Sequence, residues 1–388
     1  MRMTDDTRSL PPAAKRGEQR GGCHGGVQVD GPPVGTCGGH GVVVPTPEDV
    51  IGYDALWESA MLCMRGVRWK GSVASFELNM SEQVGKLCDQ LHDGTYRPMT
   101  PTCFKVHSPK ERDIVGIRFR DRVYQRSLND NCVYPMMSPS WIYDNCACQE
   151  GKGTDFARGR LVAHIEREMR SSGAVPHVLM ADVKGYYPNM RHDVTEDVFQ
   201  RYLPDWAFER VRDILRQQYP GDVGYNPGSQ LVQIAGVSVL SELDHVLKEG
   251  MHAKRYVRYM DDMRIVSHDV GFLLDIMDCI AGYLRDIGFE LNARKTLIRP
   301  LRRAVPFCGF DFVVRNRRVL MFLHGDSVRR MRRRVGRLAR LEARGERPPG
   351  TAEQSYLGWR AHAAKGCSTR LLDNNDRWFT ELEGKFAC

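Results

Sequence analysis

Residues 255–268 read RYVRYMDDMRIVSH and place two adjacent aspartates, Asp261 and Asp262, between two short alternating segments. This alternation on both sides of the pair is typical of a strand, a tight turn and a returning strand. Two carboxylates this close raise each other's pKa unless a cation lies between them, so the pair favours a bound metal ion. Asp is also a common turn residue, and an ordinary hairpin turn is the alternative interpretation.

A third carboxylate follows another apolar segment. Residues 178–188 read VLMADVKGYYP and predict a buried strand that ends at Asp182, followed by a turn with Tyr186 and Tyr187. A carboxylate at the end of a buried strand is costly without a partner, so Asp182 also needs a cation. The segment between Asp182 and Asp261 is long enough for two helices before the hairpin returns beside this strand. The three carboxylates together would form a cage for two Mg²⁺ ions roughly 3.5–4 Å apart, as in phosphoryl transfer.

Length and composition bound the class of protein. The chain has 388 residues, enough for two or three compact regions, and no apolar run approaches about 18 residues, so no membrane span is expected. The first residues carry charges without a following hydrophobic stretch, and we expect a cytoplasmic protein. The 12 cysteines are scattered and are expected to be reduced. The net charge of +8 is concentrated near the C-terminus, which indicates a polyanionic partner.

Residues 1–45 are rich in Gly, Pro and polar residues and are predicted to form a disordered leader. Cys23, His24, Cys37 and His40 could be imagined as zinc ligands, but the glycine-rich context offers no flanking structure. We therefore expect no zinc site.

A helical pattern begins at Thr46. Its predicted apolar face consists of Ile51, Leu56, Ala60 and Met61. Further on, Trp69, Lys70, Ser72 and Phe76 interleave basic and aromatic side chains. These residues either contact nucleic acid or pack Trp69 and Phe76 into the core.

Residues 108–128, SPKERDIVGIRFRDRVYQRSL, follow a short predicted strand at 104–106 and predict a strand, a turn and a helix. The stretch is dense in cations, namely Lys110, Arg112, Arg118, Arg120, Arg122 and Arg126. Cations this dense repel each other, which indicates a phosphate-binding arm. The alternative is a solvated face in which Glu111, Asp113 and Asp121 serve as partners. The Gly-Lys-Gly turn at 151–153, before a helix that begins near Asp155, does not match a Walker A loop.

The second half of the chain supplies four more predicted features. A loop that ends in Pro227-Gly228 precedes a helix over 228–248, which carries Gln233 and the small residue Gly236. An amphipathic helix over 272–287 is followed by Lys295, and residues 307–310 predict an apolar turn between strands. A final helix places Met331, Val335, Leu338 and Leu341 on one face, with eight arginines between positions 329 and 344 on the others. A nucleic-acid backbone is the natural source of counterions for such a helix.

The order of these features resembles that of reverse transcriptases. Along the chain they are the basic arm, the strand with Asp182, the Gly-Gln helix, the Tyr-Met-Asp-Asp hairpin at 259–262, the Lys295 segment, the apolar turn and the basic helix. The resemblance extends from about Trp57 to Phe386. The segments PKERDI (109–114), FRDRVYQRSL (119–128), GKGT (151–154), RYMDD (258–262) and SYLGWRAHAAKGCSTRLL (355–372) are similar to stand-alone bacterial enzymes of diversity-generating retroelements and anti-phage defence groups. Gly228 and Gln233 match the diversity-generating pattern Gly-x-x-x-Ser-Gln. Val232 stands where that pattern has serine, and Pro227 precedes the glycine, which weakens this assignment to a subgroup.

The resemblance implies an α/β (α+β) right-hand polymerase fold with fingers, an antiparallel-sheet palm and a helical thumb. Residues 46–175 would form an N-terminal extension and the fingers. Residues 176–324 would form the palm, with the helix 228–248 between fingers and palm, and residues 325–388 the basic thumb.

The resemblance also implies roles for single residues. Asp182 and Asp261 would bind two Mg²⁺ ions, with Mn²⁺ as a substitute, supported by Asp262 and the carbonyl of Val183. Lys295 would donate a proton to pyrophosphate. Lys110 and Arg112 would bind the triphosphate of the nucleotide. Tyr187 would block a ribose 2′-hydroxyl, and Gln233 and Gly228 would line the nucleotide and template side. Tyr186 takes the blocking role instead if the turn is shifted by one. Phe307 and Gly309 would contact nucleic acid in a primer grip formed by residues 307–310. The other residues expected to contact nucleic acid are Arg122, Arg329, Arg330, Arg333 and Arg337.

The implied activity is that of an RNA-directed DNA polymerase. It would add dNTPs to a primer 3′-hydroxyl on an RNA template, a dedicated non-coding RNA of a retroelement or an anti-phage defence system. Its partners would be the template RNA, the DNA primer and product, and dNTPs, with an accessory protein or a second copy left open and no membrane. The alternatives are a template-independent nucleotide polymerase of a defence system, an RNA-templated RNA polymerase, and an inactive RNA-binding scaffold.

Overall fold

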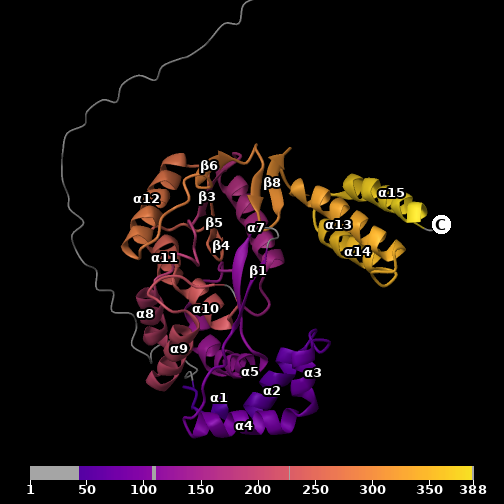
Figure 1. The fold of residues 1–388 in the computed structure, drawn as a ribbon. Coiled ribbons are helices and arrows are strands. Elements are labelled where there is room, and N and C mark those ends of the chain that lie inside the picture. Colours follow the sequence, from indigo (N-terminus) through magenta and orange to yellow (C-terminus); the bar gives the residue numbers. More distant parts are fainter. Residues whose placement is uncertain (1–42, 107–110, 227, 387–388) are drawn as a thin grey trace, which may run out of the picture. The chain divides into compact units, whose positions relative to one another are not determined.

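The computed structural model describes residues 43–106, 111–226 and 228–386, and the described residues from Val43 onwards belong to one compact unit. This unit mixes helices with antiparallel sheets, as the sequence predicts (Figure 1). The predicted leader up to residue 42, with Cys23, His24, Cys37 and His40, lies outside the described residues, as does Lys110.

The central sheet carries the residues singled out above. It consists of β3 (His177–Asp182), β4 (Tyr256–Tyr259), β5 (Asp262–Ser267) and β6 (Leu297–Pro300), in the order β4-β5-β3-β6. All of its strand pairs are antiparallel. The register pairs Asp182 with Asp262 and Tyr259 with Asp262, so β3 ends where the β4–β5 hairpin turns.

Helices cover both faces of this sheet. Leu179 and Ala181 of β3 pack into a core that includes α12 (Val270–Asp286). Val178 and Met180 point the other way, into a core that includes α7 (Thr154–Ser172). Successive side chains of a strand point to opposite faces, so the apolar run of β3 is explained by burial on both sides.

The N-terminal part of the unit is helical and leads into a two-stranded arm. Its elements are α1 (Glu48–Ile51), α2 (Tyr53–Met64), α3 (Gly71–Leu78), α4 (Met80–His92), β1 (Thr102–Val106), β2 (Arg112–Gly116), α5 (Phe119–Leu128), η1 (Asn129–Val133), α6 (Tyr134–Met137) and η2 (Ser138–Ser140). The single helix predicted from Thr46 is wrong, because the backbone leaves helical geometry at Gly52. Met61 is also wrong as a core position: it is exposed, and Met64 is buried instead.

The two aromatic residues that follow α2 behave differently. Phe76 is buried and contacts Phe119 of α5 edge to face, with ring centroids 4.9 Å apart. Trp69 is 79% exposed, so the packing alternative holds for Phe76 and fails for Trp69.

Between β3 and β4 the chain forms α8 (His192–Tyr202), α9 (Asp205–Gln218), α10 (Gln230–Ser238), α11 (Ser241–His245) and η3 (Val246–Gly250). The one helix predicted over 228–248 is therefore three consecutive pieces, the first capped by the Ser229 side chain, which accepts from the Leu231 amide. Gly228 has a φ of +152°, and a Cβ there would lie 2.2 Å from the Val115 carbonyl oxygen. Only glycine lets this loop approach β2 so closely.

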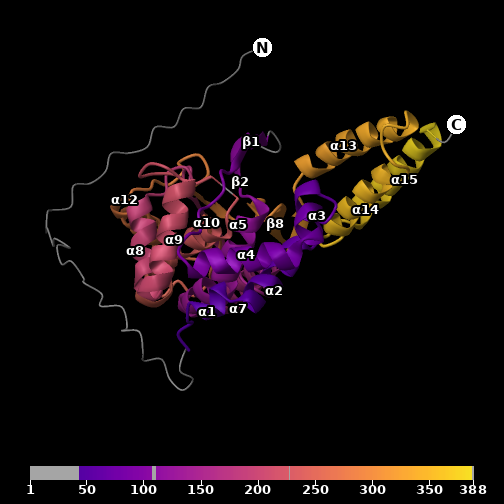
Figure 2. The same cartoon turned by 60° about the horizontal axis from the view of Figure 1, so that its bottom comes forward.

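A second sheet and three helices complete the unit. The sheet contains β7 (Val305–Phe307), β8 (Phe310–Arg315) and β9 (Arg318–Leu323), and the helices are α13 (Asp326–Ala343), α14 (Thr351–Ala363) and α15 (Thr369–Phe386), which lie together in Figures 1 and 2. Met331 and Val335 are buried on α13 as predicted, but Ala339 completes the buried face and Leu338 and Leu341 are only partly buried. Within the described ranges, no helix has the length and apolar character needed to cross a membrane.

Candidate active site

The β4–β5 hairpin presents Asp261 at its tip. Strand β4 ends at Tyr259 and β5 begins at Asp262, so Met260 and Asp261 form the turn. Met260 has a φ of +57°, in the left-handed region that side chains rarely adopt. The tip conformation therefore needs support from the residues around it.

That support comes from a buried ion pair. Arg258 and Asp244 of α11 have fully buried side chains, and Arg258 Nε donates to Asp244 Oδ1 over 2.8 Å. Arg258 also donates to the carbonyl oxygens of Met260 and Val237, each over 2.9 Å, and Tyr256 Oη donates to Asp244 over 2.7 Å. One guanidinium thus ties the hairpin turn to α10 and α11.

Asp182, at the end of β3, is held by the segment that follows α12. Lys295 Nζ lies 2.6 Å from Asp182 Oδ1, and Asn292 Nδ2 lies 3.1 Å from Oδ2. The next residue, Val183, is buried and pairs with Leu291 in an isolated bridge. The structure therefore brings Asp182, Val183 and Lys295 together, although Lys295 is far from Asp182 in sequence.

Asp262 is engaged by an arginine from its own strand. Arg264 forms an ion pair with Asp262, and its Nη2 donates to the Pro306 carbonyl over 2.6 Å. The guanidinium also lies over the Phe307 ring, 5.1 Å from its centroid. Arg264 thus links the β4–β5 hairpin to strand β7.

Asp261 forms no ion pair with any of the described residues. Burial raises its pKa to about 6, and the nearby charges of Asp182 and Asp262 contribute to the rise. A carboxylate in this position is stabilised in its charged form by a bound cation, and carboxylate oxygens are the ligands that Mg²⁺ prefers. The donor set of Asp182 and Asp261 therefore fits the expected Mg²⁺.

The cage of three carboxylates is not preassembled. Across residues 43–106, 111–226 and 228–386, no three His, Cys, Asp or Glu side chains are grouped so that they could hold a metal ion together. Asp182 instead binds Lys295, and Asp262 binds Arg264. Any metal bound by Asp182 must therefore compete with the ammonium group of Lys295.

The two tyrosines after β3 have distinct environments. Tyr186 is buried, and its hydroxyl donates to the Gly236 carbonyl over 2.6 Å, which excludes it as a residue that faces a nucleotide. Tyr187 is half-buried beside the charge of Asp261. A Cβ at Gly236 would lie 2.8 Å from the Tyr187 hydroxyl oxygen, so this glycine makes room for the ring.

Gln233 on α10 lies next to the hairpin. Cys148 Sγ is 4.0 Å from Gln233 Oε1 and 3.9 Å from Met260 Sδ, so the three side chains form a continuous surface. Gly228 and Gln233 both line a cavity that also reaches the β1–β2 arm. The predicted nucleotide and template side is therefore a connected region.

The expected primer grip is an apolar turn, as predicted, but its phenyl groups face inward. Phe307 and Phe310 are buried in the core shared with α7. The Cys308 carbonyl accepts from Arg158 Nη1 over 2.8 Å, and Gly309 has a φ of +84°. A primer could meet only the turn backbone and the Cys308 side chain here, not the rings of Phe307 and Phe310.

The basic residues fall into two groups. Arg120 and Arg126 form ion pairs with Asp121 and Asp130, which agrees with the alternative of a salt-bridged face. Arg122 is exposed, as are Arg329, Arg330, Arg333 and Arg337 on α13. Arg112 lies in β2, but its side chain, like Lys110, lies outside what the structure describes.

No family model matches this sequence, and no curated protein is similar to it. Solved structures of telomerase match this chain at low sequence identity. Telomerase from Candida albicans in complex with a TWJ fragment of telomeric RNA has 11% identity and a TM-score of 0.46, covering 75% of this chain and 55% of that one. Apo telomerase from Candida tropicalis has 13% identity and a TM-score of 0.39, covering 56% and 47%. Its form truncated from the C-terminal domain has 14% identity and a TM-score of 0.40, covering 57% and 55%. The chain thus spans about half the length of these telomerase chains.

Sequence reasoning missed the residues that hold the site in place. Arg258 has a usable signal, because it is two positions from Tyr256 and therefore on the same, buried face of β4. Arg264 has the same kind of signal, because it is two positions from Asp262 and therefore on the same face of β5. Asp244 has no comparable signal, since its partners are set by how separate segments pack. Asp144 is a further residue that sequence reasoning missed. It is buried and contacts Arg160, His164 and Lys248.

Proposed function

We propose that this chain is an RNA-directed DNA polymerase that adds dNTPs to a primer 3′-hydroxyl on an RNA template. The observation that carries the proposal is the register of β3 against β5, which pairs Asp182 with Asp262 and sets Asp261 beside them at the hairpin tip. A strand end and a hairpin tip that deliver carboxylates to one point suit phosphoryl transfer.

Two Mg²⁺ ions, or Mn²⁺ in their place, would be held by Asp182 and Asp261, supported by Asp262 and the Val183 carbonyl. Bound there, they would supply charge stabilisation for the attacking and leaving oxygens. The chain's own residues supply the rest. The side chain of Lys295 is 53% exposed. Its Nζ would donate a proton to the leaving pyrophosphate.

The nucleotide side would be formed by Tyr187, Gln233 and Gly228, with Lys110 and Arg112 for the triphosphate. Tyr187 would exclude a ribose 2′-hydroxyl and so favour dNTPs. A dedicated structured RNA would serve as template, in a retroelement or an anti-phage defence system in the cytoplasm. An accessory protein or a second copy of the chain would complete the assembly in either setting.

The test is incorporation of labelled dNTPs and NTPs with Mg²⁺ on primed RNA and without template. Wild type is compared with Asp182→Asn and Asp261→Asn. Asp275→Asn is the matched control, because Asp275 is an exposed carboxylate on α12. We expect template-dependent DNA synthesis in wild type and control, reduced by at least about a hundredfold in the two site variants.

Each other outcome favours another function. Synthesis without template indicates a template-independent polymerase, and efficient NTP use indicates an RNA polymerase. A wild type that stays inert on RNA copurified from its own host would refute the proposal and leave an RNA-binding scaffold.

A further inference from the structure

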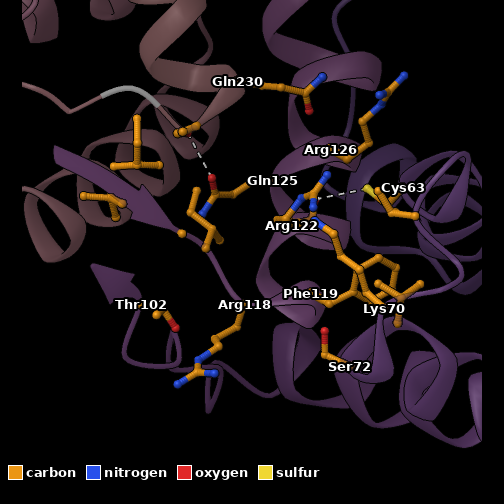
Figure 3. Close-up of a pocket in the computed structure, with 18 of the residues that line it drawn as sticks. Cys63, Lys70, Ser72, Thr102, Arg118, Phe119, Arg122, Gln125, Arg126 and Gln230 are labelled. Carbon is orange, nitrogen blue, oxygen red and sulfur yellow. Dashed lines mark hydrogen bonds between the residues drawn. The ribbon is translucent and has the colours of Figure 1, made fainter. Parts of the chain in front are cut away.

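A cavity of about 700 Å³ lies between the N-terminal helices, the β1–β2 arm and α5 (Figure 3). Five cations line it: Arg65, Lys70, Arg118, Arg122 and Arg126. Among the described residues that line it, none is acidic. Such a one-signed surface favours a polyanionic ligand.

Two of these cations, Arg122 and Arg126, are four residues apart on α5, so they lie on one face of the helix about 6 Å from each other. Arg118 is the residue just before this helix, and its Nε donates to the Thr100 carbonyl over 3.0 Å. Like charges four residues apart destabilise a helix. Phosphates that follow one another along an extended nucleic-acid strand would both relieve the repulsion and match the spacing.

Several charged and polar groups of the cavity lack ion-pair or hydrogen-bond partners among the described residues. In the described part of the chain, Arg65, Lys70 and Arg122 form no salt bridge and are exposed. Gln125, which also lines the cavity, is 3% exposed, and its Nε2 has no hydrogen-bond partner among the described residues. A buried donor without a partner is costly, and a ligand oxygen would satisfy it.

The cavity leads to the hairpin. It shares Arg65, Arg126, Gln230 and Gln233 with an adjoining cavity of about 590 Å³, which also includes Cys148. Cys148 lies 3.9 Å from Met260 in the hairpin turn. A strand in the first cavity can therefore continue to the hairpin turn, past Asp130 and Glu150 in the adjoining cavity.

One exposed aromatic side chain lines this cavity, and a second belongs to the residue next to one of its lining residues. Phe104 of β1 lines it and is 50% exposed, and Trp69 adjoins the lining residue Lys70. The Lys70 ammonium lies 5.6 Å from the centre of the Trp69 ring. Exposed aromatic rings beside a basic groove are typical of surfaces on which unpaired bases stack.

We propose that this cavity binds the unpaired strand that enters the catalytic hairpin, with Arg118 and Arg122 on its phosphates and Trp69 stacked on a base. The ligand is single-stranded RNA, held by charge and stacking without a sequence requirement. The assignment of that strand as the template rests on the proposed function; the binding itself does not.

The test measures the affinity of the full chain for fluorescently labelled RNA, by anisotropy and without dNTPs. The RNAs are a blunt RNA–DNA duplex and the same duplex with an unpaired 5′ RNA overhang of increasing length. Variants are Arg118→Ala/Arg122→Ala and Trp69→Ala. The control, Arg68→Ala/Lys86→Ala, removes two cations from the N-terminal helices outside the cavity.

We expect wild type and control to bind the overhang duplex more tightly than the blunt one. Trp69→Ala should reduce this gain by about 5- to 150-fold, the range for loss of one base–aromatic stack. The double arginine variant should reduce it by at least about tenfold and weaken its salt dependence. Arg118→Lys/Arg122→Lys should retain most of the gain, and unchanged melting curves show that the variants fold.

Equal affinity for blunt and overhang duplexes, or an undiminished gain in all variants, overturns the inference. The two proposals fail separately. If primer extension is normal while the cavity variants bind overhangs like wild type, only this inference fails. If no primer is extended while the variants lose the overhang gain, only the polymerase proposal fails.

Discussion

At the level of single residues, Arg258 shows how a buried ion pair supports the hairpin turn that carries Asp261. Its guanidinium has Asp244 as its only ion-pair partner among the described residues, and it also holds the carbonyl of Met260. Removing one partner of a buried pair leaves an uncompensated charge. Replacing Asp244→Asn should therefore lower the free energy of unfolding by about 3–5 kcal/mol in urea titrations.

Glu242→Gln is the matched control, since Glu242 lies on the same helix but its side chain is 49% exposed beside Arg201. It should change stability by no more than about 0.5 kcal/mol. Equal losses from the two substitutions would show that the buried pair has no special role.

Tyr187 and Tyr186 give a prediction on nucleotide choice. Tyr187→Ala should lower the preference for dNTPs over NTPs by at least about tenfold, because it removes the half-buried ring beside Asp261. Tyr186→Phe should leave the preference unchanged, because its hydroxyl is bound to Gly236 in the core. Single-nucleotide incorporation measures both, and a preference that shifts only in Tyr186→Phe would reverse the assignment.

At the level of elements, helix α10 is shaped by one glycine. Alanine normally stabilises a helix interior relative to glycine by roughly 0.5–1 kcal/mol. At Gly236 the added Cβ would lie 2.8 Å from the Tyr187 hydroxyl, so this ring must move. Gly236→Ala should therefore forfeit the expected stabilisation and weaken dNTP selection.

Gly282→Ala in α12 is the control, since nothing lies within 4 Å of a Cβ there. This substitution should raise the melting temperature and leave the preference for dNTPs over NTPs unchanged. A stabilised Gly236→Ala protein with unchanged selection would mean that Tyr187 does not depend on this contact.

Asp144 joins three elements and gives a dependence on pH. Burial alone would raise its pKa, but the close contact with His164 and the hydrogen bonds from Arg160 on α7 and Lys248 on η3 outweigh burial and lower it. A carboxyl whose pKa is lower in the folded state adds stability above its unfolded pKa of about 3.9 and loses it as the pH falls. Stability should therefore decline below about pH 4, and Asp144→Asn should flatten that decline.

Urea unfolding at several pH values between 6 and 3 measures this effect. Asp275→Asn serves again as the exposed control and should retain the slope of the wild type. If Asp144→Asn and wild type lose stability in parallel, other carboxyl groups account for the acid sensitivity.

At the level of the whole molecule, the arginines of α13 should govern binding of nucleic acid by charge. Arg333 and Arg337 are exposed, whereas Arg332 contacts Asn375 and lies over Trp378. Arg333→Ala/Arg337→Ala should weaken RNA binding and reduce the slope of log affinity against log salt by about 1.4 to 2, since each cation that binds a phosphate contributes about 0.7 to 1. Arg333→Lys/Arg337→Lys should keep the slope of the wild type. The prediction is wrong if salt titrations give the same slope for the wild type, the double alanine variant and the double lysine variant.

Local patterns predicted elements well wherever neighbouring residues decide the structure. The hairpin at 256–267 follows from alternation and turn residues, and α12 follows from its apolar spacing. The prediction failed where a single residue interrupts a pattern, as Gly52 does in the first helix. It also failed for Trp69, because aromatic character does not tell whether a partner surface exists.

The sequence by itself determined the strand that ends in Asp182, the hairpin that carries Asp261 and Asp262, and the cationic character of the arm and of α13. These depend on backbone preferences and side-chain periodicity within a few residues. Only the tertiary structure decided that Asp182 pairs with Asp262, that Lys295 reaches Asp182, and that Arg258 is neutralised by Asp244. Each of the last three depends on packing between distant segments, where burial and charge compensation select one arrangement among many that local preference allows.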